Sequence, residues 1–259
     1  MIKTILKYSL RLFILAIGVT SLYLANLFLM KPYSIDHYLG KELVLDLIDS
    51  PESMTYLGVF DNFNWLTKHN SKLSIPNEDD LEKNIKETEK IIKTLYKYKD
   101  SNLTASQVNT KEIAIFDYEN NYKELKEFPY HDYPLNQIGG VHLNTIQFLN
   151  DFHPIRNYSE ASDFISRVKL IDEVYDGVLA DLEKQANVKI FPPEFVYERV
   201  IKQLNEFINY SNEEHPLYSQ FIKKVEDLNL NIEDKEFFRN EIIKAIEDSV
   251  SPGFKKLLG

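Results

Sequence analysis

Residues 159–186 read SEASDFISRVKLIDEVYDGVLADLEKQA, and this stretch decides the fold class. Apolar residues recur along it at the spacing of one helix face. They are Ala161, Phe164, Ile165, Val168, Ile171, Tyr175, Val178, Leu179, Leu182 and Ala186. The spacing predicts one helix that begins at Ser159 and runs for roughly seven turns of 3.6 residues.

Further amphipathic segments surround this stretch, separated by short polar or proline-marked breaks. Ser50-Pro51-Glu52 starts a helix, since a capping Ser precedes Pro at the first helical position. Asn77 is expected to cap another, and Pro192-Pro193 to open a third. Other helices are predicted over residues 35–48, from 104 to before Pro129, and over residues 217–228 and 233–250.

Composition agrees with a helical protein. The chain has 259 residues, 44% of them hydrophobic and only eight of them Gly, and Glu, Lys, Leu and Ile dominate. Such a mixture favours long helices over a turn-rich β architecture. We expect an all-α fold, with an anchor or signal segment over residues 1–30 and one continuous helical domain over residues 31–259.

The charge distribution argues against a nucleic acid partner. The net charge is −10, and residues 1–30 contain Lys3, Lys7 and Arg11 but no acid, which leaves 27 basic against 40 acidic residues elsewhere. A surface that acidic repels phosphate backbones. Cysteine is absent, which excludes disulfides, thiolate metal ligands, a cysteine nucleophile and a lipid-modified cysteine, and is compatible with export.

The N-terminal segment is apolar enough to cross a membrane. Leu12 to Met30 reads LFILAIGVTSLYLANLFLM, without a charge, and a helix of this length spans roughly 28 Å. The basic residues precede it and mixed charges follow it. The positive-inside rule therefore predicts a single-pass inner-membrane protein with a cytoplasmic N-terminus and its bulk in the periplasm or outside the cell.

A cleavable signal peptide is the alternative to this anchor. Signal peptides also begin basic and turn apolar, but their apolar stretch is shorter and ends in a small-x-small site. Val19-Thr20-Ser21 is a tolerable site, whereas Tyr23-Leu24-Ala25 places a ring where a small residue is needed. Hydrophobicity continues beyond both, which favours an uncleaved anchor.

No motif for catalysis or metal binding is present. A zinc-peptidase helix needs two His four residues apart with a Glu after the first, and the spacing of all six His fails this test. They are His37, His69, His131, His142, His153 and His215. No G-x-S-x-G elbow occurs, and Gly139-Gly140 lacks the Lys of a phosphate-binding loop. We therefore assign no catalytic, cofactor-binding or metal-ligating residue.

An aromatic loop precedes the Gly pair. Phe128, Tyr130 and Tyr133 cluster there with Pro129 and Pro134. Such a cluster can line a cleft. Packing of the loop onto a helical body is the alternative explanation, and the more common one for aromatic residues beside Pro.

Several blocks resemble the bacterial family known as domain of unknown function 885. SPESMTYLG is similar to its early segment, YPLNQIGGVHLNTIQFLNDFHPIRNYSEASDFISRV to its central block, and IFPPEFVYERVIKQL to the following proline-started helix. HPLYSQF and VSPGFKKLL resemble the last stretch before the second half of that family. The blocks cover about four fifths of the chain in the family's order.

The resemblance implies one lobe of an all-helical, two-lobed fold with a deep cleft, similar to zinc-dependent carboxypeptidases. The family's candidate zinc site, an H-E-x-x-P-G-H helix, belongs to its second half, and this chain ends at Gly259 before such a helix. Zinc is therefore expected only in that second half. The implied substrate is a peptide.

Two functions follow from these observations. The chain is either the lobe of a metallopeptidase-like protein, inactive alone, or a membrane-tethered binding or scaffold protein. In the first case, a separately encoded C-terminal half completes the lobe, or the lobe is the remnant of a split gene. In both cases the lipid bilayer is the partner of residues 12–30.

Overall fold

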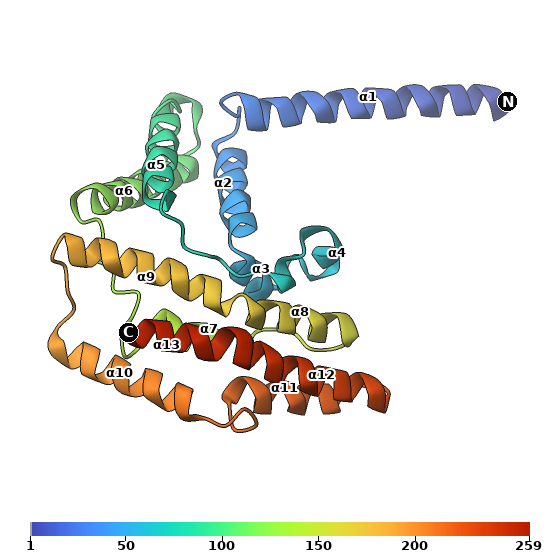
Figure 1. Ribbon diagram of the computed structural model, residues 1–259. Coiled ribbons are helices and arrows are strands. Elements are labelled where there is room, and N and C mark those ends of the chain that lie inside the picture. Colours follow the sequence, from blue (N-terminus) through green and yellow to red (C-terminus); the bar gives the residue numbers. More distant parts are fainter. Residues whose placement is uncertain (1) are drawn as a thin grey trace. The chain divides into compact units, whose positions relative to one another are not determined.

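The computed structural model describes the backbone of residues 2–259 and the side chains from Leu6 onward, and every regular element in that range is helical (Figure 1). The all-α prediction is confirmed. The chain divides into two compact units, one of residues 1–46 and 83–127, the other of residues 47–82 and 128–259. The expected division into residues 1–30 and residues 31–259 stays a prediction.

The first unit contains α1 (Ile2–Leu29), most of α2 (Ile35–Asp49) and α5 (Asp80–Leu95), the 3-10 turn η3 (Asp100–Asn102) and α6 (Ala105–Glu127). A small apolar core holds it together, formed by Ile35, Tyr38, Ile91, Leu95 and Tyr98. The Tyr98 hydroxyl donates to the Pro32 carbonyl at 2.7 Å, which fixes the segment between α1 and α2. Burial raises the pKa of Tyr98 to about 12.

Helix α1 is long and apolar enough to cross a bilayer. Its stretch Leu6–Leu29 has a mean hydropathy of 2.1, and nearly all of its side chains are exposed. Asn26, a polar residue near its end, accepts the Tyr33 N–H at 3.1 Å and donates to the Lys31 carbonyl at 3.3 Å. The predicted N-terminal apolar helix is thus present. Lys3, one of its three basic residues, lies among the side chains that are not described.

The second unit is larger and has its own core. Its elements are α3 (Pro51–Leu57), η1 (Asp61–Phe63), α4 (Asn64–Thr67), η2 (His69–Ser71), α7 (Val141–Asp151), α8 (Tyr158–Lys169), α9 (Ile171–Asn187), α10 (Glu194–Asn209), α11 (Pro216–Glu226), α12 (Ile232–Ala245), the π-helical turn η4 (Ile246–Val250) and α13 (Ser251–Leu258). Helix α13 packs beside α9 and α10, and α12 beside α8 and α11 (Figure 1).

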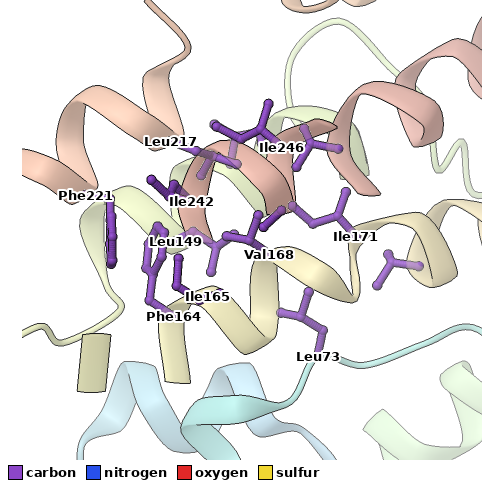
Figure 2. Close-up of a cluster of buried hydrophobic side chains, with 14 of the residues drawn as sticks. Leu73, Leu149, Phe164, Ile165, Val168, Ile171, Leu217, Phe221, Ile242 and Ile246 are labelled. Atoms are coloured by element: carbon purple, nitrogen blue, oxygen red, sulfur yellow. The ribbon is translucent and has the colours of Figure 1, made fainter. Parts of the chain in front are cut away.

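Helix α8 supplies the centre of that core. In Figure 2, Phe164, Ile165 and Val168 from α8 lie against Leu149 of α7 and Ile242 of α12. These five side chains are at most 5% exposed. The apolar stripe that predicted the fold class is therefore the stripe that the core buries.

Most predicted helix starts are confirmed. The Ser50 hydroxyl accepts the Ser53 N–H at 3.2 Å at the start of α3, and Pro193 lies immediately before α10. Asn77 does not cap a helix directly, contrary to the prediction. Its side-chain oxygen accepts the Asp79 N–H in a turn that precedes α5, and α5 begins only at Asp80.

The single long helix predicted from Ser159 is wrong, because the stretch forms two helices that meet at Leu170. The side chain of Ser249, in η4, explains the break. Its hydroxyl accepts the Asp172 N–H and donates to the Lys169 carbonyl, both at 3.0 Å. A side chain inserted between backbone groups in this way interrupts the helical ladder.

The last predicted helix also extends further than expected. Helix α12 passes through η4 into α13, so helical structure continues to Leu258 rather than ending at Val250. The π-helical turn has one extra residue per hydrogen-bonded ring. It is this turn that presents Ser249 to the α8–α9 junction.

Helix α9 packs closely on residues 72–77 at Gly177. A Cβ at Gly177 would lie 2.6 Å from the Pro76 carbonyl oxygen, whereas a Cβ at Gly40 in α2 meets nothing within 4 Å. Ala in a helix gains up to about 1 kcal/mol over Gly, but overpacking costs about 1–3 kcal/mol. We expect Gly177→Ala to lower the stability of the detergent-solubilised chain, measured by thermal melting.

The matched control is Gly40→Ala, which we expect to leave the melting temperature unchanged or raised. A Gly177→Ala variant that melts no lower than the original chain would contradict the close approach of α9 to Pro76.

Candidate binding cleft

A cleft of about 490 Å³ opens between α3 and α7 in the second unit. Its lining is mainly apolar and aromatic, with a few polar groups. The lining residues are Leu47, Glu52, Ser53, Tyr56, Leu57, Asn144, Gln147, Phe148 and Phe152. Sites for small ligands and peptide side chains commonly have this size and composition.

Three aromatic rings form one wall of the cleft. The Tyr56 ring centroid lies 4.7 Å from that of Phe152, and the Phe152 centroid lies 6.5 Å from that of Phe148. Tyr56 and Phe152 are largely exposed, at 62% and 43%. A ligand that covered these rings would remove apolar surface from water, which favours binding.

The polar groups of the cleft are partly engaged within the protein. The Glu52 carboxylate accepts the Ser74 N–H and the Ser74 hydroxyl, both at 2.7 Å. The Asn144 side chain donates to the Gly139 carbonyl at 2.7 Å. Ser53 and Gln147 complete the rim. Amide, hydroxyl and carboxylate groups can orient a peptide-like ligand, and this set contains no activated nucleophile.

A buried arginine lies behind the aromatic wall. Arg167 of α8 is fully buried, and its guanidinium carbon lies 4.8 Å from the Phe148 ring centroid. Its Nε donates to the Lys72 carbonyl at 2.8 Å. Its Nη2 donates to the Thr55 hydroxyl at 2.6 Å and to the His69 carbonyl at 2.9 Å, with a longer contact to the Pro51 carbonyl at 3.3 Å.

All of these partners are neutral, so the cation is held by dipoles. Burial lowers the pKa of Arg167 to about 10, and the more distant carboxylates of Glu52 and Asp163 oppose that shift. The guanidinium therefore stays charged at neutral pH. By binding acceptors on α3 and η2 at once, it fastens residues 51–72 onto α8.

His153 completes the arginine's surroundings. Arg167 Nη1 lies 2.9 Å from His153 Nδ1, and His153 Nε2 lies 3.0 Å from the Glu160 carbonyl. Because a guanidinium can only donate, Nδ1 must accept and Nε2 must carry the proton. Burial, followed by the charge of Arg167, lowers the pKa of His153 to about 3. The imidazole is therefore neutral at neutral pH.

Two of the six His, His69 and His153, both contact Arg167, and the other four lie on other elements. His37 is exposed in α2, and His131 lies in the aromatic loop with its Nδ1 3.1 Å from the Pro129 carbonyl. His142 contacts Gln203, His215 accepts the Leu217 N–H at the start of α11, and His69 is buried with its Nδ1 2.7 Å from the Thr67 hydroxyl. Within the described residues, no group of three or more His, Asp or Glu side chains is placed to hold a metal ion.

The aromatic loop contributes to a second cavity, of about 200 Å³. Tyr133 lines it together with Tyr197 of α10 and Leu257 of α13. Phe128 instead contacts the edge of His131, and Tyr130 has a positive φ of 67° in the turn. Of the three predicted aromatic residues, Tyr133 thus lines this cavity.

Sequence reasoning missed the main cleft and Arg167, although one signal was available. Arg167 comes three residues after Phe164 and four before Ile171, so it lies on the apolar side of the stripe that predicted the helix. A charged residue on that face has to be buried with partners.

Comparison with known proteins identifies the family. Residues 51–259 match a family described as "Bacterial protein of unknown function (DUF885)". The chain belongs to the DUF885 family. No curated protein matches this DUF885 chain.

One solved structure has a similar fold, described as "the putative lipoprotein from Colwellia psychrerythraea". The two share 19% sequence identity with a TM-score of 0.72 over 84% of this chain. The match covers only 40% of the other protein, so the DUF885 chain spans about two fifths of that neighbour's length.

Arg167 is the residue on which the cleft's back wall depends. We expect Arg167→Met to destabilise the chain by at least about 3 kcal/mol, because several buried acceptors lose their donor and each unsatisfied group costs about 1–3 kcal/mol. Chemical denaturation of the solubilised chain measures this loss.

Arg167→Lys is the matched control, since it keeps the charge but not the planar fork of donors. Its expected stability lies between those of the original chain and Arg167→Met. Equal stability of all three proteins would show that the guanidinium does not hold residues 51–72.

The buried histidines make the fold sensitive to acid. An unfolded His has a pKa of about 6.5, whereas those of folded His153 and His215 are about 3 and about 4. Below about pH 6.5 both imidazoles bind a proton in the unfolded chain but stay neutral in the folded chain. Each of these His therefore removes about 1.4 kcal/mol of stability per pH unit down to its folded pKa, and the contribution is fully present above pH 6.5.

Urea denaturation at a series of pH values measures this slope. His153→Asn keeps an acceptor for Arg167 but cannot titrate, so we expect a shallower slope below about pH 6.5. An unchanged slope in this variant would contradict a neutral, buried His153.

Proposed function

We propose that this chain is the membrane-anchored, non-catalytic lobe of a metallopeptidase-like protein, with its bulk on the periplasmic or extracellular side. In this proposal α1 crosses the inner membrane once, and the cleft between α3 and α7 receives part of a peptide substrate. A separately encoded C-terminal half supplies the zinc-binding H-E-x-x-P-G-H helix, and this chain is inactive alone.

The fold match to a much longer protein carries this proposal. The chain has the fold of about two fifths of its solved neighbour, and the family match accounts for residues 51–259. A domain that forms part of a larger fold in one protein is suited to work with a complementary part in another.

The anchor and the cleft add support. An apolar N-terminal helix and a lipoprotein description for the solved neighbour both favour a membrane-anchored or secreted protein. The aromatic wall of Tyr56, Phe148 and Phe152 suits apolar side chains of an extended peptide, and the amides of Asn144 and Gln147 suit its backbone.

Reconstitution tests the proposal. We expect the purified full chain with zinc to leave a mixture of fluorogenic peptides intact, and hydrolysis to appear when a C-terminal half with the H-E-x-x-P-G-H helix is added. Phe152→Ala should raise KM more than it lowers kcat, because the ring would bind substrate away from the reacting bond.

Phe237→Ala is the matched control, since this exposed ring of α12 lies outside the cleft. Peptide hydrolysis by the full chain alone with zinc would contradict the proposal that this chain is the non-catalytic lobe.

A membrane-tethered binding or scaffold protein is the second candidate, and the core of the second unit favours it. That core contains buried side chains from α7 to α13, several of them fully buried (Figure 2). A lobe with such a core can be stable without a second half. A monomeric chain that melts cooperatively and gains no hydrolytic activity from any C-terminal half would support this candidate.

A further inference from the structure

The apolar loop, defined as residues 58–66 from the residue after α3 to Leu66 in α4, presents several large exposed apolar side chains. Four large side chains along it are between 53% and 75% exposed. They are Val59, Phe63, Trp65 and Leu66, and none of the four lines the cleft. Contiguous exposed apolar surface of this kind marks a contact with a partner or a membrane.

The loop is firmly attached at its base, so this exposure does not arise from a fraying segment. Asn64 donates to the Asp163 carboxylate at 2.9 Å and accepts the Asn70 N–H at 3.1 Å. The Asn70 side chain in turn accepts the Thr55 hydroxyl at 2.8 Å, and Arg167 binds that same hydroxyl.

The single charge within the loop lies in an ion-pair network in which Arg156 bridges two carboxylates, those of Asp61 and Glu160. Asp61 is the only charged residue between Tyr56 and Leu66, and its carboxylate accepts from Arg156 at 2.9 Å. Lys68 follows the loop and is exposed. The outer part of the loop therefore offers aromatic and aliphatic side chains, bordered by a cation. Trp, Phe and Leu beside Lys are the residues that settle at a membrane interface.

The chain's own connectivity brings a bilayer within reach. Only 27 residues separate Met30, the last residue of the predicted span, from Gly58 at the start of the loop, and α2 accounts for fifteen of them. A fifteen-residue helix is about 22 Å long. Tethering of this kind raises the effective concentration of the bilayer at the loop, so even weak insertion becomes favourable.

We propose that the apolar loop inserts Trp65 and its apolar neighbours into the outer interface of the membrane that α1 spans. This inference rests on the proposed membrane-spanning α1. The part of the chain after residue 30 is strongly acidic, so apolar contact rather than attraction to anionic lipid drives the insertion. The partner is therefore a phosphatidylcholine-type interface, and insertion should not require anionic lipid.

Trp65 is the sole tryptophan of the chain and reports on the loop directly. The full chain is reconstituted into phosphatidylcholine liposomes with and without brominated acyl chains, and flotation first establishes that α1 holds the protein in the bilayer. We expect bromolipid to reduce the Trp65 emission about twofold and aqueous iodide to have little effect, since an interfacial side chain lies about 5–10 Å deep.

The matched control carries Trp65→Phe and Phe237→Trp. Phe237 of α12 is 48% exposed and is flanked by Lys235, Glu236 and Arg239, so an indole there should respond to iodide and not to bromolipid. The proposal is supported if iodide quenches the control and bromolipid quenches the original chain.

Three other outcomes overturn it. Quenching of Trp65 by iodide alone shows that the loop faces water. Resistance of Trp65 to both quenchers shows that protein, such as a second copy or a partner lobe, covers the loop. Failure of the chain to float removes the anchor itself and this inference with it, whereas flotation without bromolipid quenching overturns only the insertion.

Discussion

A single buried guanidinium holds the larger unit in its form. Arg167 carries a charge into the core without a carboxylate partner in contact, and it is tolerated there because carbonyls, a hydroxyl and an imidazole surround it. These partners come from α3, η2 and the segment before α8. The guanidinium therefore determines where residues 51–72 lie, and with them the aromatic wall of the cleft and the base of the apolar loop.

The sequence predicted those features that depend on neighbouring residues. A capping Ser50 before Pro51, the proline pair before α10 and the apolar stripe of α8 each act through residues within a turn or two, so local rules identify them. The break at Leu170 was not predictable in this way. It depends on the Ser249 hydroxyl, about 80 residues later in the chain, and a long apolar stripe gives no sign of such an insertion.

The candidate site shows the same limit. Tyr56 and Phe152 meet at one wall although nearly a hundred residues separate them, and no spacing rule relates them. The aromatic loop was recognisable because its rings are close in sequence, and its Tyr133 lines a cavity. Resemblance identified the DUF885 family but not the cleft, because it compares the order of whole blocks rather than side chains that meet in space.

The long sequence separation of the arginine contacts has a consequence for biogenesis. Arg167 lies between 95 and 116 residues after the carbonyls of Lys72 and Pro51 that it binds. The ribosome synthesises the acceptors first. Residues 51–82 therefore leave the ribosome with exposed apolar side chains, and they cannot take their native position until α8 has been synthesised. Contacts this distant slow folding. The nascent chain therefore exposes this segment until α8 has been synthesised.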